Sequence, residues 1–450
     1  MASVITVGGL ATGLNSDDII TKLLQLERQP IVLLQNEFAR ADANKSAVAS
    51  LSSRLSAVKN AASALNTVGK VLVRKAATSD AAVVVAAAGE GADRGSVGLN
   101  VTQLARNSVA GSTIGAASAT ATVAAGAGTF AFQVGSGPAQ TVTLGATTTL
   151  QDLAGAITDL SAGVTASVVN LGTASTPDYR LALSTSTTGS SSTLTVLHDD
   201  TTLGVQTSQA GQNARFSVSG FSGTFERETN TVTDVLNGVT LSLKSEGAAT
   251  VTVDDDAAAI TAKVQALVAS FNDAVTFVQQ ASEITQTQAG NDVRLGSLAA
   301  DSSARRVVEQ LHSTFSSALA GATGGFVNLS SLGLATQRDG TIGFNQTKFS
   351  AALASDATGL AQVFAGNGVG AGIANDLATF ADRATQSGGM LDIRSHAIDQ
   401  TERSIQDQID VRQRQVDKVA VELKAQFAAL ESFVNNLKTQ GNFLSSVLGR

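Results

Sequence analysis

Apolar residues recur with a helical period of about 3.6 over the first part of the chain. Ser16 or Asp17 can cap a first turn, where the carboxylates of Asp17 and Asp18 suit the positive end of a helix dipole. Because proline lacks an N–H donor, we predict a first helix to about Arg28 and a second that begins at Pro30. The apolar row comprises Ile20, Leu24, Ile31, Leu34, Phe38, Val48, Leu51, Leu55, Val58 and Leu65.

The far end of the chain carries a heptad pattern. One line is fully apolar and a second, three residues further on, is half polar, which is typical of a coiled-coil seam with an imperfect second edge. A single helix from about Leu391 to Val447 would be roughly 85 Å long. The first line is Ile409, Val416, Leu423, Leu430, Leu437 and Leu444, and the second is Arg412, Val419, Gln426, Phe433, Gln440 and Val447.

We predict that these two helical ends pack against each other. A helix of that length cannot bury its apolar stripe alone, and the other long stripe of the sequence lies at the N-terminus. The chain between them would then be an insertion. The alternative is that each end joins a different bundle or dimerises separately.

The period changes to two between about residues 75 and 253. Short runs rich in Thr and Val alternate apolar with polar positions, and glycines, Pro138 and Pro177 separate them. Such runs at close spacing predict antiparallel sheets. A helix from Leu150 to Leu160 is expected to interrupt them.

Helices are predicted again from Asp254. A further helix spans about Leu298 to Leu319, and two short strands with a turn at Asp339-Gly340 follow it. The chain is therefore expected to be α+β, with helices at both ends and antiparallel sheets between them. The first of the later helices places one row of apolar side chains on a single face, namely Ile260, Val264, Leu267, Phe271, Val275 and Val278.

Composition narrows the classes of function. The 450 residues suggest about three domains, and the net charge of −7 argues against binding nucleic acid or an anionic membrane. The sequence has no cysteine, so disulfides and thiolate metal sites are excluded. No apolar run reaches about 18 residues, so we expect no membrane insertion. The first residues do not resemble a secretory signal, which predicts a cytoplasmic protein or export without a cleaved signal peptide.

The residues that carry chemistry form no catalytic pattern. Glycines at positions 8, 9 and 13 precede a helix, but no Gly-Lys-Ser/Thr follows them, so a P-loop is not indicated. The three histidines, His198, His312 and His396, are too far apart in sequence to suggest a triad or a metal site. The run from Asp254 to Asp256 is better explained as a helix N-cap than as a metal site. We therefore predict a non-enzyme without cofactor or metal, which acts through shape and assembly.

Motifs along most of the chain match one known family. The head reads GLATGLNSDDIITKLLQLERQP, in which a Gly-Leu-x-Ser/Thr-Gly-Leu motif precedes a short helix that ends in Glu-x-x-Pro, here Glu27 to Pro30. A later segment has Gly223, Arg227 and Asn230, followed by Gly-Val-Thr-Leu from Gly238 to Leu241. The tail reads AQFAALESFVNNLKTQGNFLSSVL. Together, in this order, these segments resemble the bacterial flagellar filament cap proteins, also called the hook-associated protein 2 family.

The resemblance implies an α+β fold with long terminal coiled-coil-like helices and a helical bundle that carries inserted antiparallel β domains. A segment in the middle of the chain is similar to a repeat shared by flagellins and caps. The expected parts are a terminal helical leg (1–40 and 405–450), a helical bundle domain with a β-hairpin (41–75 and 254–404), a β domain (76–108 and 212–253) and a nested outer β domain with one short helix (109–211).

The function implied by the resemblance is that of a structural cap at the distal end of the flagellar filament, outside the cell, in the service of motility. Copies of the chain would form a homo-oligomer, a pentamer by resemblance, that retains exported flagellin and promotes its folding and polymerisation. Other expected partners are hook-filament junction proteins, the flagellar export apparatus and an export chaperone that binds the C-terminal region. Export in an unfolded state would need no cleaved signal peptide.

We expect the oligomer or filament interface to lie on the terminal helices, because their apolar stripes require partners. The residues expected there are Leu10, Leu14, Ile20, Leu24, Ile31, Leu34, Phe38, Ile409, Val416, Leu423, Leu430, Leu437 and Leu444.

The sequence is also compatible with other functions. A different axial component, such as a junction protein or a flagellin variant, would also pair helical ends around a β-rich middle. A polysaccharide-acting enzyme or adhesin would use the β-rich middle, but an enzyme of this kind needs paired carboxylates in a cleft, and the middle of the chain has few. Adhesion to host surfaces or glycans is kept as a secondary role of a cap.

Overall fold

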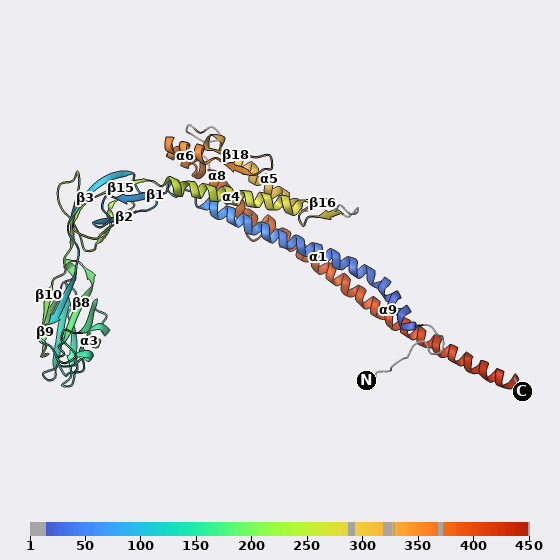
Figure 1. Ribbon diagram of the computed structural model, residues 1–450, viewed down its shortest axis with the longest axis horizontal. Helices are drawn as coiled ribbons and strands as arrows, with labels where there is room; N and C mark the ends of the chain where they lie inside the picture. The colour runs from blue at the N-terminus through green and yellow to red at the C-terminus, as the bar shows by residue number, and fades with distance from the viewer. Residues whose placement is uncertain (1–14, 287–292, 318–325, 327–328, 368–371, 449–450) are drawn as a thin grey trace. The chain divides into compact units, whose positions relative to one another are not determined.

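The computed structural model describes residues 15–286, 293–317, 326, 329–367 and 372–448 (Figure 1). The chain divides into a helical unit, Met1–Val71 with Thr261–Arg450, and a β-rich unit, Leu72–Ile260. Long helices and antiparallel sheets confirm the predicted α+β class.

The helical unit is built around its longest helices. α1 and α9 lie side by side (Figure 1), which confirms that the two ends of the chain pack together. They are antiparallel, because Ser16 Oγ lies 3.4 Å from Glu431 Oε1 while Lys45 Nζ lies 3.2 Å from Glu402 Oε2. The helices are α1 (Ser16–Ser63), α2 (Val68–Val71), α4 (Ala257–Ser282), α5 (Ser302–Ser317), α6 (Gln346–Ser355), α7 (Ala357–Ala365), α8 (Ile373–Thr385) and α9 (Met390–Leu448).

The predicted break in the N-terminal helix is wrong, because α1 continues through Pro30. Proline removes the bond to the carbonyl of Leu26, but Pro30 lies on the exposed side, where water can solvate that carbonyl. The next residue, Ile31, is turned by about 100° around the helix axis and is buried, so packing holds the helix together. The predicted N-caps, Ser16 and Asp17, are also wrong: the cap is Asn15, whose side chain accepts a hydrogen bond from the N–H of Asp18 at 3.3 Å.

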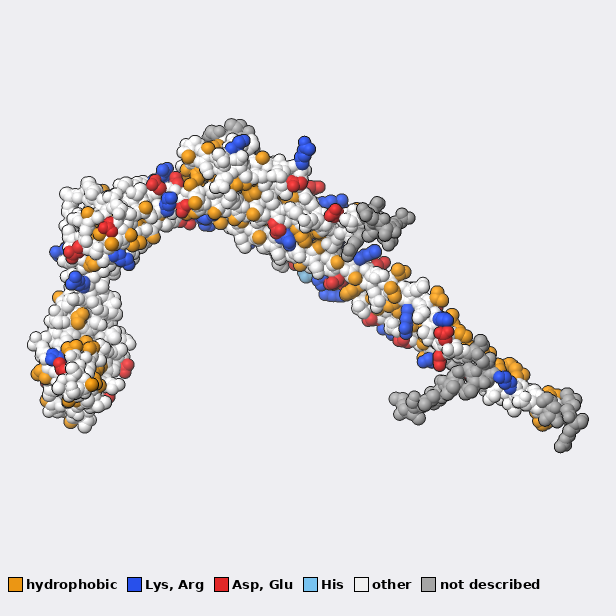
Figure 2. All heavy atoms as spheres, viewed as in Figure 1, with side chains coloured by type: hydrophobic (Ala, Val, Ile, Leu, Met, Phe, Trp, Pro, Cys, Tyr) orange, Lys and Arg blue, Asp and Glu red, His pale blue; other side chains and the backbone are white. Residues whose placement is uncertain are grey.

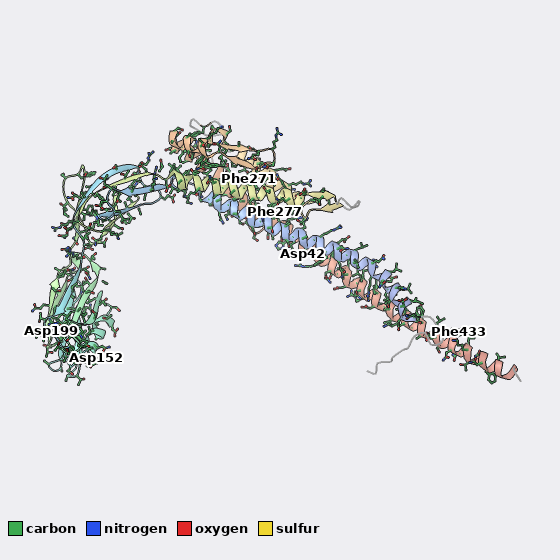
Figure 3. The ribbon with its side chains drawn as sticks, viewed as in Figure 1. Asp42, Asp152, Asp199, Phe271, Phe277 and Phe433 are labelled. Atoms are coloured by element: carbon green, nitrogen blue, oxygen red, sulfur yellow. The ribbon has the colours of Figure 1, made fainter. Side chains whose placement is uncertain are left out.

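Helix α4 buries the apolar face that the sequence predicts, from Ile260 to Val278. Its N-terminus is capped by Asp256, which accepts a hydrogen bond from the N–H of Ala259 at 3.0 Å. Phe271, which is labelled in Figure 3, packs against Phe315 of α5, with ring centroids 5.3 Å apart. The predicted N-cap and helix are therefore confirmed. Helix α5 begins four residues later than expected, because Asp301 caps it.

Short hairpins pack on this helical core. The hairpin predicted at Asp339-Gly340 is confirmed, since β18 (Leu334–Thr336) pairs with β19 (Ile342–Phe344). A second hairpin, β16 (Ile284–Gln286) with β17 (Val293–Leu295), was not predicted, because strands of three residues give too little alternation to recognise.

Asn272 of α4 fixes the β18–β19 hairpin. Its side chain accepts the N–H of Ile342 at 2.6 Å and donates to the carbonyl of the same residue at 2.9 Å. We expect Asn272→Ala to lower the free energy of unfolding by about 2–3 kcal/mol, because it leaves both backbone groups of a buried residue unpaired. Urea unfolding measures this change. Asn435→Ala, on the exposed side of α9, is the control and should change stability by less than about 0.5 kcal/mol; equal effects of the two variants would contradict the prediction.

One part of the β-rich unit, formed by strands within residues 74–103 and 214–255, has a hydrophobic core of its own. The core contains Phe216, Leu241 and Val251 among other apolar residues. One sheet has the order β1-β15-β3-β11-β12 and another the order β13-β14-β2. The strands are β1 (Arg74–Thr78), β2 (Val84–Ala88), β3 (Gly95–Gln103), β11 (Ala214–Val218), β12 (Phe225–Arg227), β13 (Thr231–Leu236), β14 (Val239–Leu243) and β15 (Gly247–Asp255).

A second core lies between residues 110 and 205 and includes Phe130, Phe132 and Leu183. Its sheets have the orders β10-β4-β8-β7 and β6-β5-β9, and α3 packs against β7. The predicted boundaries of the nested outer β domain, residues 109–211, and of the terminal leg, residues 1–40 and 405–450, remain predictions. The elements are β4 (Asn107–Ser112), β5 (Gly128–Val134), β6 (Gln140–Leu144), α3 (Leu150–Asp159), β7 (Val164–Asn170), β8 (Tyr179–Thr188), β9 (Leu194–Asp199) and β10 (Val205–Gln209).

Candidate functional site

The predicted interface residues of the terminal helices fall into different environments. The contacts Ser16–Glu431 and Lys45–Glu402 place Leu24 level with Leu423 in the antiparallel pair. Ile20, Ile31 and Val416 are buried, and Leu24, Leu34, Phe38, Ile409 and Leu423 are half-buried. Leu430, Leu437 and Leu444 are exposed, and Leu10 and Leu14 lie outside the described residues.

The buried members form a seam that joins α1 to α9 within one chain. Ile31 and Val416 are level with each other, and both are nearly inaccessible to solvent. Lys45 flanks this seam and forms ion pairs with Asp399 and Glu402. The hydrogen bond from Lys45, together with its charge, lowers the pKa of the Asp399 carboxyl. The seam therefore holds the two helices together within a single chain and needs no second copy.

Helix α1 carries a further apolar row on its solvent side, which we call the outer stripe (Leu23, Leu26, Pro30 and Leu33). These residues are spaced three, four and three positions apart, so they lie on one face of the helix. Leu26 and Leu33 are 62% and 64% exposed. A contiguous apolar row of this kind indicates an interaction surface. The sequence prediction missed this row, although its spacing was visible beside the row of Ile20 and Ile31.

Helix α9 carries a second exposed row near its C-terminus, the distal stripe (Leu430, Phe433, Leu437 and Leu444). Their side chains are between 44% and 61% exposed. Figure 2 shows apolar side chains at this end of α9, and Figure 3 labels Phe433 there. The heptad line leaves the seam here, because α1 begins at Ser16, level with Glu431, and has no residue further along α9.

An ion pair between Asp301, which precedes α5, and Arg394 of α9 ties the start of α5 to α9. Asp301 is 1% exposed, and its Oδ2 accepts a hydrogen bond from Arg394 Nε at 2.7 Å. Its Oδ1 accepts the N–H groups of Ser303 and Ala304. Burial raises the pKa of the Asp301 carboxyl, but the bond and charge of Arg394 and those N–H groups outweigh it, so the net pKa is lowered. Asp301 is therefore a charged structural anchor.

A cavity of about 770 Å³ lies beside the β16–β17 hairpin. Its walls include Arg40 and Asn44 of α1 and the exposed apolar pair Ile284 and Leu295. Asn44 Nδ2 donates to the carbonyl of Ser297 at 2.8 Å.

The described residues contain no group of three or more His, Asp or Glu side chains that could hold a metal ion. In the same part of the chain, no helix is long and apolar enough to cross a membrane. The histidines have separate contacts: His198 lies 3.0 Å from Asp200, and His312 Nε2 lies 2.6 Å from the carbonyl of Gly340.

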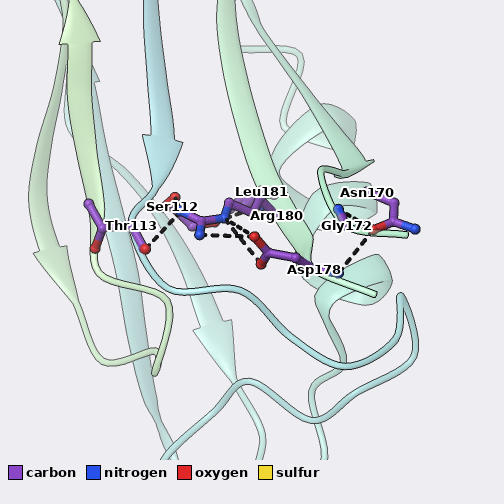
Figure 4. Close-up of polar contacts among 7 residues, drawn as sticks. All are labelled: Ser112, Thr113, Asn170, Gly172, Asp178, Arg180 and Leu181. Atoms are coloured by element: carbon purple, nitrogen blue, oxygen red, sulfur yellow. Dashed lines mark hydrogen bonds and ion pairs between the residues drawn. The ribbon is translucent and has the colours of Figure 1, made fainter. Parts of the chain in front are cut away.

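The outer β region has very few charges. Arg180 of β8 is its single Lys or Arg between residues 107 and 214 in the sequence, and Figure 2 shows few charged side chains there. Arg180 Nη1 donates to the carbonyls of Ser112 and Thr113, and Nε donates to Asp178 at 3.1 Å (Figure 4). Asn170 accepts the N–H groups of Gly172 and Asp178 (Figure 4). Arg180 thus holds one end of β4 to the loop between β7 and β8.

We expect Arg180→Ala to lower the free energy of unfolding by about 1.5–3 kcal/mol, because several hydrogen bonds to a charged group are lost together. Arg180→Lys should recover little, since an ammonium group cannot make the same forked contacts. Arg215→Ala is a matched control. Its ion pair with Glu226 is about half exposed, so its loss should cost less than about 1 kcal/mol. Thermal unfolding of the variants measures the difference, and a larger effect of Arg215→Ala would contradict the prediction.

Comparison with known proteins identifies the family. The profile of the flagellar hook-associated protein 2 C-terminus matches residues 211–439, and that of the N-terminus matches residues 12–108. The A-type flagellar hook-associated protein 2 of Pseudomonas aeruginosa is 24% identical over an alignment 493 positions long, which covers 100% of this chain and 98% of the relative. The flagellar hook-associated protein 2 of Escherichia coli K12 is 24% identical over 99% of this chain and 98% of the relative.

The fold has a solved counterpart. The crystal structure of the D1-D2-D3 domains of the flagellar cap protein FliD from Escherichia coli matches with a TM-score of 0.66 and 24% identity, and the match covers 78% of this chain and 99% of that chain. The two chains therefore share a fold over the aligned part. With both of its profiles matched along the sequence, this chain belongs to the flagellar hook-associated protein 2 family.

Proposed function

We propose that this protein is a structural cap at the distal end of the flagellar filament, outside the cell. In this role it forms a homo-oligomer that retains exported flagellin and promotes its folding and polymerisation at the tip. The observation that carries the proposal is the outer stripe of α1 in a chain of this family. A cap acts by assembly, and it needs a self-complementary or neighbour-complementary surface rather than a catalytic site.

The outer stripe is suited to contact between copies. Its residues lie on the side of α1 away from the buried Ile31, so a second helix can pack there without separating α1 from α9. A ring requires that one surface of each copy meets a different surface of the next copy. The family resemblance favours a ring of five. The buried seam residues Ile20, Ile31 and Val416 would then support the interface from within the chain, instead of touching the neighbour.

The remaining partners follow from the same proposal. Flagellin and the hook-filament junction proteins would meet the assembled cap, and the flagellar export apparatus would deliver the chain with the help of a chaperone bound to its C-terminal region. The exposed distal stripe of α9 supports such a chaperone contact, because an apolar helical face is a common target for a binding groove. Adhesion to host glycans is a separate secondary proposal, which binding of the full-length chain to a glycan array tests.

A deletion strain tests the proposed function. We expect cells without the gene to lack filaments and to release flagellin monomers into the medium, and the full-length gene should restore filaments. Electron microscopy and immunoblots of the medium provide the two readouts. Intact filaments of normal length in the deletion strain would overturn the proposal, and loss of filaments without secreted flagellin would indicate a role in export or in the hook instead.

A further inference from the structure

The outer stripe of α1 carries a polar motif that its apolar row does not explain. Glu27 lies four residues after Leu23 and three before Pro30, so it flanks the stripe on one side. Its side chain is exposed and makes no ion pair or hydrogen bond with another described residue. Because Pro30 has no N–H, the carbonyl of Leu26 lacks its usual helical donor. The Glu-x-x-Pro motif therefore presents two hydrogen-bond acceptors at the edge of an apolar row.

The other flank of the stripe carries a positive charge. Lys22 lies four residues before Leu26 and about 140° around the helix axis from Glu27. Its ion pair with Asp18 is exposed and therefore weak, so Lys22 is able to change partner. The stripe is thus apolar along its middle, negative at one edge and positive at the other.

A surface of matching character lies further along the helical unit, at the cavity beside β16 and β17, which we call the hairpin cavity. Ile284 and Leu295 lie opposite each other in the hairpin, line this cavity and are each 59% exposed. Among the described lining residues, Arg40 is the only Lys or Arg and Glu283 is the only Asp or Glu. Neither has an ion-pair partner in the described part of the chain. The hairpin cavity therefore combines an apolar wall with one unpaired charge of each sign.

One copy of the chain can use both surfaces at the same time. Leu33, the last residue of the outer stripe, lies seven residues before Arg40, or about 10 Å along the helix axis. The stripe cannot enter the cavity of its own chain, because α1 is one continuous helix that contributes to both. A second copy supplies a stripe with the matching charges, and the same contact repeats from each copy to the next. Such head-to-tail contacts build rings or helical assemblies.

We propose that the outer stripe of one copy docks in the hairpin cavity of the next copy, where Leu26 inserts beside Ile284 and Leu295. This contact removes three exposed aliphatic side chains from water, which favours association. The volume of the cavity, about 770 Å³, lies within the range of protein binding pockets. The proposal rests on the proposed cap function, for which it names the surface that receives the outer stripe.

The charges of the two copies pair in this arrangement. The guanidinium of Arg40 has five N–H donors, so it binds both the carboxylate of Glu27 and the free carbonyl of Leu26. Lys22, on the other flank of the stripe, faces Glu283 of the receiving copy. No charge is then buried without a partner, which would oppose the contact. Glu27 is therefore a residue that sets the register between copies.

Engineered disulfides test the apolar part of the contact, since the sequence has no native cysteine. Purified full-length Leu26→Cys and Leu295→Cys chains are mixed under mild oxidation, and mass spectrometry of non-reduced peptides identifies the bond between them. We expect this bond to form at least about tenfold faster than in a mixture of Val32→Cys with Leu295→Cys, because docking brings the first pair of thiols together. Val32 is the matched control, since it is exposed on α1 but does not lie on the stripe.

Charge reversal tests the polar part of the contact. Glu27→Arg or Arg40→Glu alone should raise the concentration at which half of the chains are oligomeric by about tenfold, because like charges would meet. The double variant Glu27→Arg/Arg40→Glu should restore assembly, since the pair forms again with its signs exchanged. Arg28→Glu is the control and should leave assembly unchanged, because Arg28 lies on the side of α1 opposite the stripe. Native mass spectrometry of dilution series measures all four variants.

Two results would overturn the proposal, whatever oligomers the chain forms. One is equal rates of disulfide formation for Leu26→Cys and Val32→Cys, and the other is a double reversal that assembles no better than the single reversals. A dominant disulfide between two Leu26→Cys chains would also overturn it, since the stripe would then contact itself. These assays use purified protein, so their failure leaves the deletion-strain test of the cap function standing.

Discussion

Replacement of Asp301 by alanine is expected to lower the free energy of unfolding by about 2–3 kcal/mol, because a buried carboxylate that caps a helix and pairs with the partly exposed Arg394 is lost. The carboxylate is almost inaccessible to solvent and accepts hydrogen bonds from Arg394 and from the first N–H groups of α5. Its loss leaves those donors unpaired and removes the N-cap of the helix. Urea unfolding followed by far-ultraviolet circular dichroism, which reports the helices, measures the change.

Asp410→Ala is the matched control for this variant. Asp410 lies on an exposed face of α9 and accepts a hydrogen bond from Gln406 at 3.0 Å. Its removal should change the free energy of unfolding by less than about 0.5 kcal/mol. If Asp301→Ala were as mild as Asp410→Ala, the anchor role of Asp301 would be refuted.

We also expect the Asp301 carboxylate to make the stability of the fold sensitive to acid. The folded-state pKa of Asp301 lies below its ordinary value of 3.8, so the folded chain releases this proton more readily than the unfolded chain. The stabilisation is therefore fully present above pH 3.8 and is lost as the pH falls through the folded pKa. Asp301→Ala should show a shallower loss of stability below about pH 4 than the wild type. Unfolding curves from pH 7 to pH 2 measure the slopes, and parallel curves would contradict the assignment.

The second large effect is expected in the terminal helices. Ile31→Asp should lower the free energy of unfolding by about 3 kcal/mol or more, because a carboxylate without a partner would be buried against α9. Leu33→Asp, two residues away on the exposed side, should change stability by less than about 0.5 kcal/mol. The two substitutions are chemically matched and differ in the side of α1 on which they lie.

Substitutions on the exposed side of α1 are expected to affect assembly and not folding. Leu33→Asp, combined with Leu26→Asp, should fold normally but fail to form the oligomer, because charges on the outer stripe oppose its burial between copies. Native mass spectrometry of the full-length chain measures this, and swimming of the complemented deletion strain measures its consequence. Normal oligomers of the Leu26→Asp/Leu33→Asp variant would remove the outer stripe from the interface.

Most long elements could be predicted from the sequence. The row from Ile260 to Val278 fixes one face of α4 because six apolar residues recur with the helical period, and such a row leaves little choice of structure. The heptads after Ile409 likewise predict α9. The β16–β17 hairpin escaped prediction because its strands are three residues long. The structural role of Asp301 could not be predicted, because its partner Arg394 lies 93 positions away in sequence.

The candidate interface was only partly visible in the sequence. The heptad line of α9 is uniform from Ile409 to Leu444, yet its first half is enclosed by α1 and its second half is exposed. That difference depends on where α1 begins, and the contact between Ser16 and Glu431 sets this point. A periodic pattern identifies a face that needs a partner, but it does not say how far the partner extends.

The sequence by itself determined the family, the α+β class, the pairing of the helical ends and the absence of cysteine chemistry. These follow from local periodicity and motif order, which do not require knowledge of distant neighbours. Only the tertiary structure decided that α1 passes through Pro30, that Asp301 anchors α5 to α9, and that Leu26 and Leu33 face solvent. Each of these depends on which side of a helix is packed, and packing is set by residues far away in the chain.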